Sequence, residues 1–139
     1  MTEARVPARV VFACVRNAGR SQMAAAFFNR LADPGRALAV SAGTAPATSV
    51  HPAVVQVMRE VGVDLSRATP QPLTLEVAAG ASHLVTMGCG DACPFIPGAI
   101  RDDWPLPDPK DRPLHEVRAI RDDIAQLVAH WVERQGWRA

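Results

Sequence analysis

The stretch that most constrains the fold joins an apolar run to a helical pattern through a short loop. Residues 6–13 are mostly apolar and lead into Cys14, five loop residues follow, and Arg20 precedes a helical pattern that starts at Ser21. A buried parallel strand has a nearly continuous apolar run, whereas an amphipathic helix repeats its apolar residues every three or four positions. The stretch therefore predicts a strand, a loop and a helix in immediate succession.

The loop after Cys14 has the properties of an anion-binding site. The first N–H groups of a helix lack intrahelical partners, and the helix dipole adds partial positive charge in front of them. Arg20 adds a guanidinium whose fork of donors matches an oxyanion. Cys14 would lie at the floor of this cradle, where the positive field favours the thiolate. We therefore expect the loop to bind a tetrahedral oxyanion and to activate Cys14 as a nucleophile.

A lone cysteine after a strand is more often a small buried apolar residue, so the loop needs further support. Asn17 and Gly19 are residue types that tolerate left-handed backbone, which a tight cradle requires. Ser21 can cap the helix or donate a hydrogen bond to the thiolate. Together with the position between strand and helix, these residues favour the functional interpretation.

Strand and helix patterns alternate along the rest of the chain. Strands are expected at 6–13, 37–42, 82–87 and 99–102, and helices at 21–32, 52–61, 73–79 and 114–135. Such alternation predicts a parallel sheet with right-handed crossovers, whose ligands bind at the carboxyl ends of the strands. Cys14 follows the first strand, and Cys89 and Cys93 follow the third. All three cysteines are therefore expected at the same edge of the sheet.

Composition limits the function classes. The 139 residues favour one domain, and a net charge of +1 gives no support for binding to nucleic acid or to an anionic membrane. Neither a signal peptide nor a transmembrane stretch is recognisable, so we expect a cytoplasmic protein. Three cysteines in a reducing compartment favour redox chemistry or metal binding over a structural disulfide.

The Cys-x3-Cys segment from Cys89 to Cys93 is open to three interpretations. A zinc site would need further ligands, and the four histidines are scattered along the chain. The two thiols could also be unconnected. In the redox interpretation, Cys89 attacks an adduct on Cys14, and Cys93 then attacks Cys89 and carries the oxidation to the surface.

The segment from Cys14 to Ala24 resembles the active-site loop of arsenate reductases built on the low-molecular-weight protein tyrosine phosphatase fold. The resemblance continues in Ser41-Ala42-Gly43-Thr44, in 61–66, in 85–94 and in Asp103-Trp104 followed by Asp108-Pro109. It implies one α/β domain over residues 1–139, a three-layer αβα sandwich around a central four-stranded parallel sheet.

The resemblance also implies residue roles. Cys14 would be the nucleophile and Asp108, in an Asp-Pro pair, the general acid; composition alone would leave Asp102, Asp103 and Asp111 as competitors. In related enzymes coupled to thioredoxin, three cysteines act in sequence, as Cys14, Cys89 and Cys93 would here. The oxyanion would be bound by Val15, Arg16, Asn17, Ala18, Gly19, Arg20 and Ser21. The loop would be braced by Asn17, Ser21, Ser41 and Asp64.

The implied ligands are arsenate and the related oxyanions phosphate and sulfate, with no bound cofactor or metal and with a monomeric chain. The external reductant would be thioredoxin, or a small thiol such as mycothiol or bacillithiol with a glutaredoxin-like protein. Some members bind a potassium ion beside the loop through an acidic residue of the first helix. Ala25 stands at that position, which argues against a potassium site here.

Three other functions remain open at this stage. A tyrosine phosphatase would use the same loop and acid, but it usually has cysteine, proline and an aromatic residue where Gly19, Gln22 and Lys110 stand. Weak phosphatase activity is still expected from the shared cradle. An arsenate–mycothiol transferase would need only Cys14. A non-catalytic oxyanion-binding module would not require a thiol at the floor of the loop.

Overall fold

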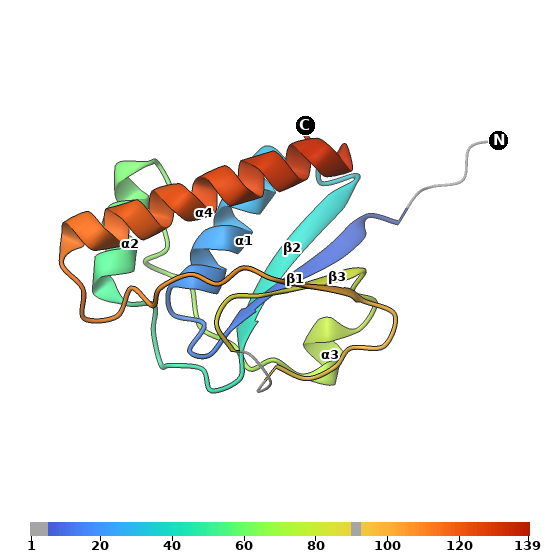
Figure 1. The fold of residues 1–139 in the computed structure, drawn as a ribbon, viewed down its shortest axis with the longest axis horizontal. Coiled ribbons are helices and arrows are strands. Elements are labelled where there is room, and N and C mark those ends of the chain that lie inside the picture. The colour runs from blue at the N-terminus through green and yellow to red at the C-terminus, as the bar shows by residue number, and fades with distance from the viewer. Residues whose placement is uncertain (1–5, 90–92) are drawn as a thin grey trace.

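The computed structural model describes residues 6–89 and 93–139, which form a parallel sheet flanked by helices (Figure 1). The sheet has four strands in the order β2-β1-β3-β4, and every neighbouring pair is parallel. The elements in chain order are β1 (Ala8–Cys14), α1 (Arg20–Leu31), β2 (Ala37–Gly43), α2 (Pro52–Glu60), α3 (Leu75–Ala78), β3 (His83–Thr86), β4 (Ile100–Asp103) and α4 (Leu114–Gln135).

The central strand β1 is buried on both faces, as its apolar sequence predicts. Val10, Phe12 and Cys14 point into the larger core, which α1, α2 and α4 cover. Val11 and Ala13 point into a smaller core shared with α3 and with the loop that follows β3. Figure 1 shows α3 on the opposite side of the sheet from the other three helices. The expected α/β sandwich is therefore confirmed, with one thick and one thin helical layer.

The long helix α4 has the bounds that its apolar spacing predicts. Val117, Ile120, Ile124 and Val128 lie on its buried face, and Gly136 ends it in left-handed conformation with φ of 73°. Among the described residues, no helix combines the length and the apolar character that a membrane crossing needs.

Strand and helix ends differ from the sequence expectation by one or two residues. β1 extends to Cys14 because the parallel register with β2 continues as far as Gly43. The short helix expected at 73–79 covers only Leu75–Ala78, because Thr74 caps its first turn by accepting the Val77 N–H at 3.1 Å. The third strand ends at Thr86, and the Met87 N–H still donates to Ala13 at 2.7 Å. The carboxyl ends of β1 and β3 therefore lie side by side.

Candidate active site

The loop between β1 and α1 turns its carbonyl groups away from its centre. The carbonyls of residues 14, 15, 16 and 18 accept N–H groups from the segment 44–51 at distances of 2.8 to 3.2 Å. The Asn17 carbonyl accepts the Gln22 side-chain amide at 3.1 Å. Gly43 allows this close approach, because a Cβ there would lie 2.7 Å from the Val15 carbonyl oxygen. The outer side of the loop is thus held by a ring of hydrogen bonds.

The inner side of the loop carries the amide N–H groups. In a planar trans peptide the N–H points opposite to the C=O, and the structure contains no cis peptide among its described residues. None of the N–H groups of residues 15–21 donates to an acceptor in the part of the chain that is described. A row of donors with no protein acceptor, ending at the first turn of α1, is suited to bind an oxyanion.

Cys14 lies at the floor of this loop. It is a free thiol and only 2% exposed. Its sulfur is 2.9 Å from the Ser21 hydroxyl oxygen, which itself accepts the Asn17 side-chain N–H at 2.7 Å. The Ser21 hydroxyl can therefore donate its own hydrogen bond to the sulfur. Of the two roles expected for Ser21, helix capping is wrong, because the N-cap is Gly19 and no side chain caps the helix.

Arg20 connects the loop to the proline-rich segment after β4. Its Nη1 donates to the Leu106 carbonyl at 3.1 Å, and its Nη2 lies 3.9 Å from Asp108 Oδ2. The Arg20 side chain is 9% exposed, whereas that of Asp108 is 48% exposed. The guanidinium is thus held in place, while the carboxyl group beside it remains accessible.

Asp108 is the carboxylate of this segment that the structure brings to Arg20. Its Oδ1 accepts the Lys110 N–H at 3.0 Å, so the carboxyl group is oriented within its own turn. Of the competing carboxylates, Asp102 accepts the Trp104 indole N–H at 3.2 Å, and Asp103 lies 3.8 Å from Arg101. Among the described residues, Asp108 is therefore the one of these carboxylates that contacts Arg20.

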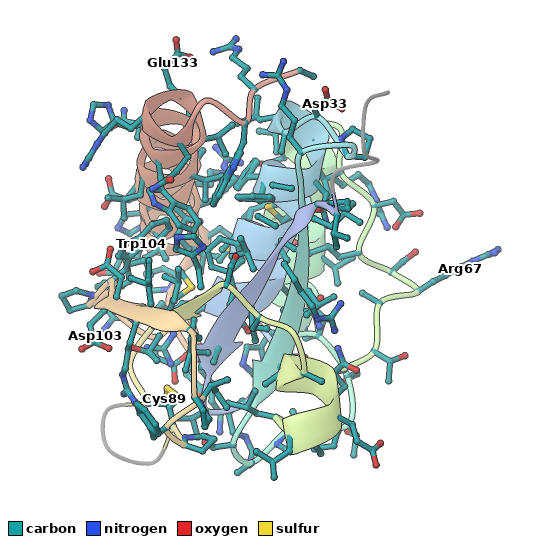
Figure 2. The ribbon with its side chains drawn as sticks, turned by 90° about the vertical axis from the view of Figure 1, so that its right-hand side faces the viewer. Asp33, Arg67, Cys89, Asp103, Trp104 and Glu133 are labelled. Carbon is teal, nitrogen blue, oxygen red and sulfur yellow. A yellow bond between two sulfur atoms is a disulfide. The ribbon has the colours of Figure 1, made fainter. Side chains whose placement is uncertain are left out.

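Cys89 and Cys93 form a disulfide, with residues 90–92 between them outside the described part. The Cys89 sulfur is 3.9 Å from the carbonyl oxygen of Ala13, the residue before Cys14. Figure 2 shows Cys89 at the end of the molecule opposite to Asp33 and Glu133. The Cys89 sulfur thus lies near the backbone next to Cys14, although the Cys14 side chain packs in the larger core and that of Cys89 in the smaller core.

The expectation that Cys93 carries the oxidation to the surface is wrong for this disulfide state. Cys89 and Cys93 are only 7% and 3% exposed. They belong to the smaller core, where Ala78 and Ile96 are also buried. Apolar packing on this side of the sheet therefore shields both sulfur atoms from solvent.

The bracing of the loop follows the expectation only in part. Asn17 has φ of 50°, as its predicted left-handed tolerance allows, but Gly19 has φ of −148°. Residue 19 has no room for a larger side chain, because the Cγ of Pro109 would lie 2.7 Å from a Cβ at this position. The left-handed expectation for Gly19 is therefore wrong. Glycine is needed at this position because the segment with Asp108 and Pro109 packs too close to leave room for a side chain.

Asp64 does not brace the loop, which corrects that assignment. Its carboxylate is exposed and accepts the Ser66 N–H at 2.8 Å, and hydrogen bonding from Ser66 lowers the pKa of Asp64. Gln71, which was not anticipated, takes the bracing position. Its N–H donates to Asn17 Oδ1 at 3.0 Å, and its side chain donates to the Ser41 carbonyl at 2.8 Å. Ser41 thus contributes its carbonyl oxygen.

Metal ligation finds no support in the described residues. No group of three His, Cys, Asp or Glu side chains gathers there as a metal ion would need.

Comparison with known proteins gives consistent results. A family model described as low molecular weight phosphotyrosine protein phosphatase matches residues 9–136. A putative arsenate reductase of Halobacterium salinarum is 42% identical over 123 residues, which cover 84% of this chain and 85% of that protein. A glutaredoxin arsenate reductase of Synechocystis is 32% identical over 129 residues, covering 91% and 97% of the two chains.

Among solved structures, the thioredoxin-dependent arsenate reductase of Corynebacterium glutamicum superposes with a TM-score of 0.79 at 36% identity. The match covers 95% of this chain but 63% of that one, so this chain spans less than two thirds of its length. The likeness therefore extends over nearly the whole of this chain.

Proposed function

Since the chain belongs to the low molecular weight phosphotyrosine protein phosphatase family, we propose that it is an arsenate reductase, an enzyme that converts arsenate to arsenite. The observation that carries this function is the Cys89–Cys93 disulfide, whose Cys89 sulfur lies 3.9 Å from the carbonyl oxygen of the residue before Cys14. A hydrolase of this family needs one nucleophile, whereas a reductase needs further thiols to supply two electrons. The arsenate reductases among its relatives support the same conclusion.

In the first step, the Cys14 thiolate attacks arsenic(V) bound in the loop. An As–S bond forms, and the As–O bond to one arsenate hydroxyl group breaks, so that this group leaves as water after accepting a proton from Asp108. The N–H groups of residues 15–21 and the Arg20 guanidinium neutralise the charge of the arsenate oxygens. Ser21 holds the sulfur in place before the attack.

In the second step, the Cys89 thiolate attacks the Cys14 sulfur. An S–S bond forms, and the As–S bond breaks with its electron pair remaining on arsenic, so arsenic(V) becomes arsenic(III) and two thiols are oxidised. Cys93 then attacks the Cys89 sulfur and releases Cys14 as a thiolate. The product of this sequence is the Cys89–Cys93 disulfide with a free Cys14, the state that the structure contains.

An external reductant must return the disulfide to two thiols. We propose a thioredoxin-type dithiol protein acting in the cytoplasm, because the final disulfide joins two residues of one loop. Both cysteines are buried in the state described above, so disulfide exchange requires that their sulfur atoms first become accessible to the reductant. The names of a thioredoxin-dependent and a glutaredoxin-type relative support an external redox partner. If a small thiol instead attacked the Cys14 adduct, Cys89 and Cys93 would not be needed.

The test is arsenate turnover followed by NADPH consumption, first with thioredoxin and its reductase and then with mycothiol and a glutaredoxin-like protein. We expect thioredoxin to support turnover and each of the variants Cys14→Ser, Cys89→Ser and Cys93→Ser to be inactive. Loss of activity in Cys14→Ser alone, with a requirement for the small thiol, would instead identify an arsenate–thiol transferase. Rapid aryl phosphate hydrolysis without arsenate turnover would identify a phosphatase.

A further inference from the structure

A chain of hydrogen bonds leads from Gln71 to the Cys14 sulfur. Gln71 lies between α2 and α3, far from the loop in sequence, and its N–H donates to Asn17 Oδ1 at 3.0 Å. The Asn17 amide donates in turn to Ser21 Oγ at 2.7 Å, and Ser21 Oγ is 2.9 Å from the sulfur. Each bond lies within ordinary hydrogen-bond distance.

The direction of this chain follows from its donors. Asn17 Oδ1 receives the Gln71 N–H and also the Gln22 Nε2–H, at 3.0 and 3.2 Å. Two donors facing one atom of the amide identify that atom as oxygen, so the Asn17 NH2 group must face Ser21. Ser21 accepts that N–H, and its own proton is then available to the sulfur. The arrangement therefore favours a donor, and not an acceptor, next to the Cys14 thiolate.

The position of Gln71 is itself held by two further contacts. Its side-chain Nε2 donates to the Ser41 carbonyl at 2.8 Å, and its carbonyl accepts the Gly43 N–H at 2.9 Å. Both partners belong to β2, which is paired with β1 along its whole length. Gln71 thus connects the loop to the rigid sheet through its side chain and its backbone.

The same contacts do not fit the potassium ion that some family members bind beside the loop. Such an ion needs several oxygen ligands, but the Asn17 side-chain oxygen is occupied by two N–H donors and the Ser41 carbonyl by a third. Ala25, at the position of the acidic ligand, has no side-chain oxygen. Amide N–H groups therefore already use these oxygen atoms, and a cation would have to displace them.

We propose that Gln71 and Gln22 are positioning residues that brace the oxyanion loop in place of a cation and keep Cys14 reactive independently of potassium. This inference rests on the proposed role of Cys14 as nucleophile but not on arsenate as the substrate. It can therefore be tested by measurements that succeed even if arsenate reduction fails.

The test uses protein with an intact Cys89–Cys93 disulfide, in which Cys14 is the free thiol, and follows its alkylation by iodoacetamide. Rates are compared in potassium, sodium and choline chloride at about pH 6 and about pH 10, below and above the usual titration range of a thiol. We expect the wild-type alkylation rates in the three salts to agree within about twofold, which is less than the effect of losing one typical hydrogen bond. A severalfold acceleration by potassium alone would overturn the proposal.

The variants Gln22→Met and Gln71→Met remove an amide with little change in volume. We expect alkylation at about pH 6 to slow by about fivefold, the loss typical of one hydrogen bond. At about pH 10 the rate should be unchanged, because this pH lies above the usual titration range of thiols, whereas a merely structural defect would alter both rates. Gln56→Met, on the exposed side of α2, is the matched control.

Phosphate protection against alkylation provides the second readout. Both variants should weaken protection by phosphate, and Gln56→Met should not. Equal rates and equal protection in all variants would contradict the proposal. If Gln71→Met does not fold, as judged by circular dichroism, Gln22→Met still decides the result, because Gln22 contacts Asn17 directly.

Discussion

Gly88 lies so close to Arg20 that a Cβ atom at residue 88 would overlap Nη1 of the guanidinium. Gly88 also has φ of 99°, a backbone conformation that favours glycine. It directly precedes Cys89, so the residue that makes room for the oxyanion-binding arginine is the neighbour of the resolving thiol. The backbone at residue 88 therefore affects both the position of the Arg20 guanidinium and the position of Cys89.

The variant Gly88→Ala should displace the Arg20 guanidinium. The displaced guanidinium would lose its charge-assisted hydrogen bonds to a bound oxyanion. Phosphate binding should therefore weaken by about 10- to 100-fold, which corresponds to a loss of about 1.5–3 kcal/mol in binding free energy. Isothermal titration calorimetry with phosphate measures this directly. Gly98→Ala is the matched control, because Gly98 has φ of 82° but no heavy atom near its Cβ position. Equal weakening in both variants would show that backbone strain, and not Arg20, is responsible.

The variant Asp108→Asn should retain phosphate binding but lose the proton donor for the leaving oxygen. We expect kcat for arsenate to fall by about 10²- to 10⁴-fold, the usual contribution of a general acid. Asp111→Asn, three residues further along the same exposed segment, should keep nearly full activity. A small loss in Asp108→Asn together with a large loss in Asp111→Asn would reassign the acid.

The contact between α2 and α4 gives a prediction for stability against pH. Hydrogen bonds from Arg118 and Arg121 lower the pKa of Glu60 from 4.5 to about 2, against a smaller opposing effect of desolvation. Because the pKa is lower in the folded state, the stabilisation is complete above about pH 4.5 and disappears as the pH falls towards about 2.

The variant Glu60→Gln should therefore melt at a lower temperature than wild type at neutral pH. The difference should shrink between about pH 4.5 and about pH 2, and it should also shrink at high salt, since Glu60 is exposed. Glu133→Gln removes the exposed pair with Arg138 within the C-terminal region and serves as the control. A difference in melting temperature between Glu60→Gln and wild type that stays constant over the whole pH range would contradict this assignment.

Much of the fold could be predicted because its signals are local. The apolar run before Cys14, the helical spacing after Arg20 and the pattern of α4 each lie within one element, and all three agree with the structure. The shared edge of the three cysteines also followed, because parallel strands end at the same side of a sheet.

The parts of the site that could not be predicted depend on contacts between distant segments. Gln71 stands between two prolines in an irregular loop, and its bonds to Asn17 and Ser41 span 54 and 30 residues. The family resemblance implied a bracing role for Asp64, but the Asp64 carboxylate accepts the Ser66 N–H within its own turn. The requirement for glycine at residue 19 likewise arises from Pro109, which only the folded chain brings near.

The most direct test of the central claim is a single turnover of the fully reduced protein with arsenate and no added reductant. Arsenite is quantified after quenching with an alkylating agent, and disulfide-linked peptides are identified by mass spectrometry. The thiol relay predicts one arsenite per chain, a disulfide between Cys89 and Cys93, and an alkylated Cys14. Absence of arsenite, or its release only when a small thiol is added, would contradict it.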